Sequence, residues 1–461
     1  MLVSFALENW KSFRGFTKIN FIAGRKRSHS ETLAKPSGYA GLKLLPISGI
    51  WGGNAGGKTN LLEALAFVKQ FVSFGFNDAG HIPVEPFRPA SIERPTYFAV
   101  SFLAGNRIYQ LEFTLTVDGV QSEALYWMTP VSPRDWRIIY ERTTGESGDA
   151  KVDFSDTLPP ELKAVPDIMD QLKACERGCG PYRLFLTNTV NQRIDVFAPL
   201  ADWFMHTLRF AGSGTKYTRF SRMMSDERYC HLFGTILRKL DTGVEQVELE
   251  DADSTEVLSL LPEYIRRDIQ TRRQVSMQIE LGAQSDIPSE VYLLTKQDRD
   301  VRIRRVQTYR RSADGILKPF GFNNESSGTR RLLELLPIFT DLWGGDSECV
   351  WLLDEIDKEF HTDLTRALIE TFLSSAGSAS RRQMLFTTHD LLLMEQSLLR
   401  VDEINVTERK RNGESVLIPL HKYKGLRNDL DLRRSYLDGR FGGVPKLAPI
   451  NVDIEGGADD E

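Results

Sequence analysis

The chain has 461 residues, of which 41% are hydrophobic and 26% charged, and its formal net charge is −5 at pH 7. This composition suits a globular protein with a large core, and it excludes a uniformly basic surface that would bind nucleic acid by overall charge. No apolar run approaches the ~20 residues of a membrane-spanning helix and nothing resembles a signal peptide, so we expect a cytoplasmic protein with no membrane partner.

A glycine-rich loop, GGNAGGKT at residues 52–59, follows the apolar run 44–51 and precedes the helical pattern 60–68. The N–H groups of such a loop and the N-terminus of the following helix bind nucleotide phosphates. Lys58 would reach the β- and γ-phosphates and Thr59 would ligate Mg²⁺. A glycine-rich turn without a ligand is the alternative. The nucleotide-binding residues predicted in this loop are Gly52, Asn54, Gly57, Lys58 and Thr59.

Two segments in the middle of the chain differ in their hydrophobic patterns. Residues 97–125 alternate apolar and polar side chains, which predicts an antiparallel β subdomain. Residues 133–286 are richer in helical patterns, as at 168–173 and 232–237, and we expect a mostly helical insertion. Without a sustained heptad repeat, this insertion is a compact lid or docking domain rather than a long coiled coil.

A serine and a glycine, Ser327 and Gly328, precede the apolar helical run 332–343. Residues of this kind cap a helix N-terminus, and the same exposed N–H groups can bind an anion. Both readings stay open from the residues alone.

Two further apolar runs, CVWLLDE at 349–355 and QMLFTTH at 383–389, are predicted to be buried parallel strands. The first ends in two acids: Asp354 would hold Mg²⁺, and Glu355 would act as the general base that activates water. A strand running into a solvated turn would explain the acids equally well. His389 ends the second run, and a lone histidine in such a place is more often structural than functional.

Basic residues cluster locally although the net charge is negative. The alternation of residues 301–306 places Arg302 and Arg304 on one face of a predicted strand, next to Arg305. These residues would bind DNA phosphates or an acidic protein that mimics DNA. The alternative is a solvated face paired with the chain's 63 acids.

The motifs occur in the order found in ABC-type ATPase heads of the SMC, RecF and OLD kind, and the chain resembles these families. The resemblance implies ATP and Mg²⁺ as cofactors, catalysis by Glu355 with His389 contacting the γ-phosphate, and a homodimer or higher homo-oligomer. In that assembly Ser327 and Gly328 of one copy complete the ATP site of another. Thr329 and Arg330 depart from the usual signature, in which a second glycine and a polar residue follow.

More of the chain is similar to compact bacterial ATPases of anti-phage defence, most of all the AriA family of PARIS systems, with the PtuA family of Septu systems as the close rival. This resemblance implies a slow, regulatory ATPase that holds a Toprim-type nuclease effector such as AriB and releases it when a phage trigger, such as an acidic DNA mimic, is sensed. The segments that carry it are 1–13, 325–330, 354–361, 387–390 and 436–445.

Two other functions stay open: a RecF/SMC-like DNA-binding repair ATPase, and a scaffold that does not turn over ATP. The fold class expected in every case is α/β, an ABC-type ATPase head with a mixed or parallel core sheet. The predicted units are an ATPase lobe at 1–132, the helical insertion at 133–286, a second ATPase lobe at 287–450, and a disordered acidic tail at 451–461.

Overall fold

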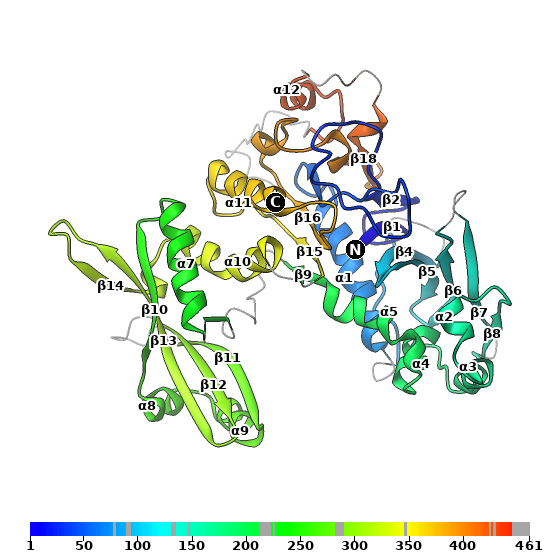
Figure 1. The fold of residues 1–461 in the computed structure, drawn as a ribbon, viewed down its shortest axis with the longest axis horizontal. Coiled ribbons are helices and arrows are strands. Elements are labelled where there is room, and N and C mark those ends of the chain that lie inside the picture. Colours follow the sequence, from blue (N-terminus) through cyan, green and yellow to red (C-terminus); the bar gives the residue numbers. More distant parts are fainter. Residues whose placement is uncertain are drawn as a thin grey trace, which may run out of the picture.

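The computed structural model describes residues 1–76, 80–88, 94–130, 135–145, 148–212, 223–224, 226–281, 290–344, 348–423, 426 and 430–444. Three β-sheets and the helices packed on them make up this part of the chain (Figure 1). None of the helices described combines the length and apolar character that crossing a membrane requires. The predicted tail, 451–461, lies outside the described residues.

The central sheet has six strands and contains all the apolar runs that precede the predicted site residues. Five strands are parallel and the edge strand β18 is antiparallel to β17. In spatial order the strands are β18 (Ser415–Pro419), β17 (Ile404–Arg409), β3 (Ile47–Gly52), β16 (Arg382–Thr387), β15 (Cys349–Leu353) and β9 (Leu208–Ala211).

Both faces of the central sheet are covered, which explains why its strands are continuous apolar runs. Alternate residues point to opposite faces, so Leu352 and Leu385 join the core around helix α1 (Lys58–Phe74). On the other face, Trp351 joins the core around α10 (Ser327–Trp343) and α11 (Thr362–Ser375). The carboxyl ends of β3, β15 and β16 therefore meet at one edge of a rigid layer.

A seven-stranded antiparallel sheet packs on the far side of α1. Its strands are β2 (Thr17–Asn20), β1 (Leu2–Glu8), β4 (Thr96–Ala104), β5 (Arg107–Thr116), β6 (Gly119–Met128), β7 (Trp136–Thr144) and β8 (Ala150–Phe154). The structure confirms the antiparallel subdomain predicted at 97–125, which β4, β5 and β6 supply.

The third sheet extends away from the other two, with short helices at its far end (Figure 1). Its strands are β10 (Val244–Asp251), β13 (Asp300–Arg311), β12 (Glu290–Gln297), β11 (Gln274–Leu281) and β14 (Leu317–Gly321), which pairs with β13 beyond the end of β12. The helices that belong to it are α7 (Glu227–Lys239), α8 (Ser254–Ser259) and α9 (Glu263–Thr271).

The remaining helices are short. They are α2 (Pro160–Lys163), α3 (Ile168–Glu176), α4 (Phe185–Asn191), α5 (Ala198–Asp202), α12 (Leu432–Leu437), the π-helix η3 (Trp203–Thr207) and the 3₁₀ helices η2 (Asp195–Phe197), η4 (Phe322–Asn324), η5 (Leu391–Leu393), η6 (Val401–Glu403) and η7 (Leu420–Lys422).

The structure differs from the predicted helical insertion at 133–286. The helical patterns at 168–173 and 232–237 are indeed α3 and α7. However, β7 and β8 complete the seven-stranded sheet, while β10 and β11 belong to the third sheet. The segment is therefore mixed α/β and is shared among all three sheets, because β9 joins the central sheet and most of its strands pair with partners outside the segment.

Candidate nucleotide-binding site

The glycine-rich loop connects β3 to α1, as predicted, and its backbone conformation requires glycine. Gly57 precedes α1 with φ of 97°, a left-handed conformation that side chains disfavour. A Cβ atom on Gly57 would lie 2.6 Å from Ser415 Oγ, and one on Gly52 would lie 2.4 Å from Thr407 Oγ1. The loop is therefore seated tightly on β17 and β18, and only its outer side is open.

Lys58 is 6% exposed, and its ammonium group lies against the backbone of the loop. Nζ donates to the carbonyl oxygens of Gly52 at 2.9 Å and Gly53 at 3.3 Å, and it lies 3.0 Å from His389 Nε2. Burial lowers the pKa of Lys58 below 10.5, and the nearby acids oppose that shift.

The pKa of His389 also lies below its ordinary value of 6.5, because burial and then the Lys58 charge disfavour the imidazolium form. A neutral ring can accept a hydrogen bond from the Lys58 ammonium group. The structure thus brings together Lys58 and His389, which are 331 residues apart in the sequence.

Thr59 and Asp354, the two predicted Mg²⁺ ligands, contact each other. Thr59 Oγ1 lies 3.2 Å and 3.0 Å from the two carboxylate oxygens of Asp354, which is 4% exposed. Thr59 is the second residue of α1, and Asp354 follows β15 directly. A hydroxyl and a carboxylate at neighbouring element ends are the hard oxygen ligands that Mg²⁺ prefers.

Glu355 lies at the mouth of the same site. Its backbone is left-handed, with φ of 52°, and its N–H donates to Thr387 Oγ1 at 2.8 Å. The side chain is about one third exposed and lines a cavity with Lys58, Thr59 and His389. A carboxylate in this position can accept a proton from water beside the phosphate loop.

This cavity has a volume of about 760 Å³, within the range of small-molecule sites. Its lining contains four cationic side chains and two acidic ones. The cations are Lys11, Lys58, Arg88 and Arg409, and the acids are Glu85 and Glu355. Its remaining lining residues are Ser12, Asn54, Ala55, Gly56, Gly57, Thr59, Asn60, Pro86, Phe87, His389 and Gly413.

The signature residues lie elsewhere in the chain. Helix α10 begins at Ser327, five residues before the predicted start, and its cap is Ser326, whose Oγ accepts from Thr329 N–H at 3.1 Å. Gly328 packs against the turn between β15 and α11, where a Cβ on Gly328 would lie 2.7 Å from the Glu359 carbonyl oxygen. Ser326 and Gly328 line a second cavity of about 610 Å³, so within one chain they line a different cavity from the phosphate loop.

The family model described as "AAA domain, putative AbiEii toxin, Type IV TA system" matches more than half of the chain. The matched residues are 47–162 and 235–395. The chain belongs to this family of AAA ATPase domains. A search of curated proteins finds no match.

Solved structures similar to this AAA ATPase domain include two SMC heads. One is described as "Crystal structure of the SmcHead bound to the C-winged helix domain of ScpA", with 13% identity, a TM-score of 0.37, and coverage of 90% of this chain and 97% of that chain. The other is "SMC head domain from Thermotoga maritima", with 15% identity, a TM-score of 0.34, and coverage of 91% of this chain and 98% of that chain.

ATP with Mg²⁺ fits the residues present in this domain. The open side of the phosphate loop lines the cavity, and the cationic side chains around it balance phosphate charge. Lys58 and the loop N–H groups would hold phosphates, while Thr59 and Asp354 would hold the metal.

Several residues that the fold brings to this site had no role predicted for them from the sequence. Thr387 contacts both acids, and Asp357 accepts from His389 N–H at 3.3 Å. Lys11 and Ser12 enter the cavity from the turn after β1, and Arg409 enters from the end of β17. Lys11, Ser12, Asp357 and Thr387 carried a signal, since all four lie in segments that resemble other defence ATPases, whereas Arg409 lies outside those segments.

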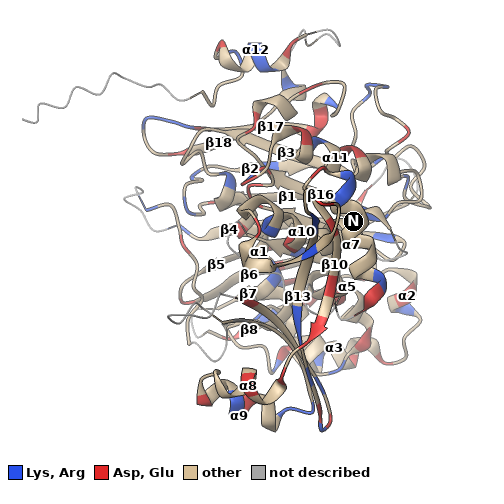
Figure 2. Ribbon diagram, turned by 90° about the vertical axis from the view of Figure 1, so that its left-hand side faces the viewer, with Lys and Arg blue, Asp and Glu red and all other residues tan. Residues whose placement is uncertain are grey.

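The basic residues of β13 lie far along the third sheet and are largely paired with acids. Arg302 forms an ion pair with Asp300 at 3.2 Å. Arg305 forms ion pairs with Glu250 at 2.7 Å and with Glu290 at 3.0 Å. Arg304 stands opposite Asp251 in the β10–β13 register, and Figure 2 shows basic β13 beside acidic residues of β10.

Proposed function

We propose that this AAA ATPase domain binds and slowly hydrolyses ATP, and that it serves as the switch or scaffold subunit of a bacterial anti-phage defence complex acting by abortive infection. One observation carries the ATPase part of the proposal: Lys58, the Thr59–Asp354 pair, Glu355 and His389 converge on one cavity. These groups come from one helix and the ends of two strands, α1, β15 and β16, an arrangement that a solvated turn would not require.

Each side chain has a role in the proposed reaction. Lys58 leaves the loop carbonyls to bind phosphate oxygens, and His389 contacts the terminal phosphate. Glu355 accepts the proton of the attacking water. Bound Mg²⁺ would supply charge neutralisation at the phosphates, held by Thr59 and Asp354. The walls formed by Lys11, Ser12 and the segment 85–88 enclose the rest of the nucleotide.

We further propose that two copies share each nucleotide. The exposed N-terminus of α10, with Ser327 and Gly328, would close over ATP held by the phosphate loop of a second copy. Support comes from the separation of the two cavities within one chain. It also comes from the helix N-terminus, whose free N–H groups favour a phosphate.

The proposed partner is a Toprim-type nuclease such as AriB, held inactive and then released when a phage trigger is sensed. This step rests on the resemblance to the AriA family and agrees with the toxin-antitoxin description of the matched family. An acidic DNA mimic would be a suitable trigger. We do not propose direct DNA binding, because Arg302 and Arg305 are already neutralised by neighbouring acids.

Replacing Lys58 tests the ATPase proposal directly. Lys58→Ala removes the charge that binds the phosphates, at about 1.5–3 kcal/mol for each charge-assisted hydrogen bond, so ATP affinity should fall by about 100-fold. The change should also abolish turnover and immunity. Binding is measured by isothermal titration calorimetry with ATP and Mg²⁺.

The control is Lys43→Ala, which alters an exposed lysine outside the cavity lining. It should bind ATP like the wild type. Unchanged ATP binding by Lys58→Ala would refute the proposed site.

A further inference from the structure

A single buried hydroxyl, that of Thr387 at the end of β16, contacts both acids that follow β15. Thr387 Oγ1 lies 2.6 Å from Asp354 Oδ1 and 2.8 Å from the backbone nitrogen of Glu355. Thr387 itself is 0% exposed and Asp354 is 4% exposed. Both contacts are therefore shielded from water, where hydrogen bonds are strongest.

The chemistry of the three groups fixes the direction of both hydrogen bonds. The Glu355 N–H can only donate, so it uses a lone pair of the Thr387 hydroxyl. The hydroxyl proton then points at Asp354 Oδ1, which accepts it as a carboxylate. Thr59 also lies within hydrogen-bonding distance of Asp354, so two hydroxyls hold this carboxylate from two elements, α1 and β16.

The backbone of the acidic turn is held at the same point. Glu355 adopts a left-handed conformation, with φ of 52°, that a residue with a side chain seldom adopts without support. The next residue, Ile356, donates its N–H to the carbonyl oxygen of Thr387 at 3.0 Å. Thr387 thus fixes the turn on both sides of Glu355, through its side chain and through its main chain.

We propose that Thr387 is a positioning residue for hydrolysis: it orients the Asp354 carboxylate toward the metal and holds Glu355 in the conformation that presents its side chain to the cavity. This inference rests on the proposed ATPase function. It explains why a β-branched residue with a hydroxyl ends β16, since valine would fill the same space but could make neither side-chain bond.

The test compares Thr387→Val, which keeps the shape, with Thr387→Ser, which keeps the hydroxyl. Thr387→Val should lower kcat by about 10- to 100-fold, the usual cost of removing a group that orients a ligand. ATP affinity without metal should stay within about threefold of wild type, while the Mg²⁺ concentration for half-maximal ATP binding should rise by about tenfold. Thr387→Ser should restore most of both losses.

The control is Thr365→Val, the same replacement at a fully buried threonine of α11 outside the cavity lining. It should leave kcat and the Mg²⁺ requirement unchanged. Wild-type kcat in Thr387→Val, or equal losses in the valine and serine variants, would overturn the positioning role. An inactive wild-type protein would instead refute the ATPase proposal itself.

Discussion

The contact between Lys58 and His389 sets the electrostatics of the site. Both groups would be cationic in water at acidic pH, yet their nitrogens lie 3.0 Å apart. Two positive charges at this distance repel, so one group must be neutral. The lowered pKa of His389 indicates that the imidazole is the neutral partner. Protonation of the His389 ring should therefore destabilise the folded protein.

The stability of the protein should depend on pH through His389. Because the folded pKa is lowered below 6.5, the unfolded chain binds more protons in this range, so stability falls as pH falls below 6.5. Thermal unfolding of wild type and His389→Gln from about pH 8 to about pH 5 should show the wild type losing more stability than the variant. A difference between the two that does not change with pH would contradict this assignment.

At the residue scale, the sequence predicted those site residues whose chemistry is local. Lys58 and Thr59 end one continuous glycine-rich motif, and Asp354 and Glu355 end one apolar run, so their spacing alone indicated their places. Thr387 could not be predicted in this way. Its contacts depend on β15 and β16 lying side by side, which is a property of strand pairing and not of either segment.

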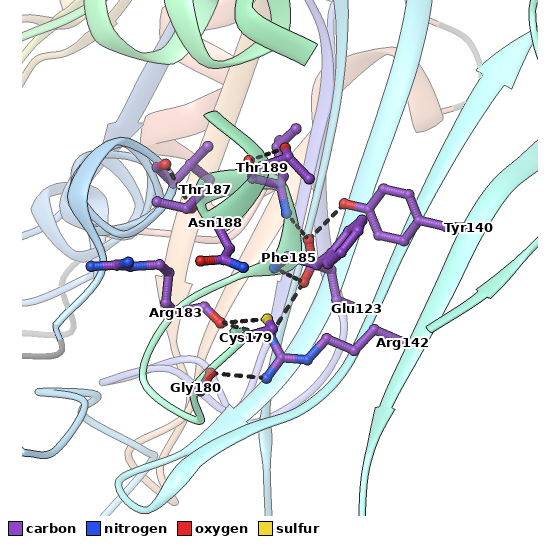
Figure 3. A network of polar contacts seen from close by, with 12 residues as sticks. Glu123, Tyr140, Arg142, Cys179, Gly180, Arg183, Phe185, Thr187, Asn188 and Thr189 are labelled. Atoms are coloured by element: carbon purple, nitrogen blue, oxygen red, sulfur yellow. Dashed lines mark hydrogen bonds and ion pairs between the residues drawn. The ribbon is translucent and has the colours of Figure 1, made fainter. Parts of the chain in front are cut away.

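Among the elements, a buried ion pair fastens α4 to the seven-stranded sheet (Figure 3). Glu123 of β6 accepts hydrogen bonds from Tyr140 Oη at 2.7 Å and from the N–H groups of Phe185 at 2.6 Å and Leu186 at 3.1 Å. Arg142 lies 3.6 Å away, and neither charged side chain is exposed. Burial and the Glu123 charge raise the pKa of Tyr140 well above 10, which keeps its hydroxyl protonated as a donor.

Removing Glu123 should destabilise the protein strongly. Glu123→Ala leaves the Arg142 charge buried without its acid and two N–H groups of α4 without acceptors. The free energy of unfolding should fall by about 3–5 kcal/mol. The measurement is guanidinium denaturation followed by tryptophan fluorescence.

The matched control is Glu141→Ala, which alters an exposed glutamate of the neighbouring strand β7. Its effect should stay within about 0.5 kcal/mol. If the two variants were equally stable, the ion pair would not be what fastens α4.

At the element scale, the sequence predicted those strands and helices that bury either one face or all of their faces. Alternation identified β4 to β6, and the continuous run before Asp354 identified β15, since each pattern follows from which faces are covered. The segment 133–286 was predicted less well. Its strands β10 and β11 carry few buried residues, so their pattern resembles that of exposed helices, and β10 pairs with β13, about 50 residues further along the chain.

Across the whole molecule, the separation of the two cavities has the widest consequence. The phosphate loop and Glu355 line one cavity, and Ser326 and Gly328 line another. Under the proposed function, a single copy therefore holds an incomplete site, and turnover requires two copies. The third sheet extends away from the two sheets that frame this site (Figure 1).

The most direct test of this account is the ATPase rate of a mixture of two variants, Lys58→Ala and Ser327→Arg. Each variant alone should be inactive, because every shared site then carries one defect. A mixed dimer regains one intact site, formed by Lys58 of one copy and Ser327 of the other, so mixing should restore turnover. A mixture of folded variants that stays inactive, or full turnover by Ser327→Arg alone, would contradict a site shared between copies.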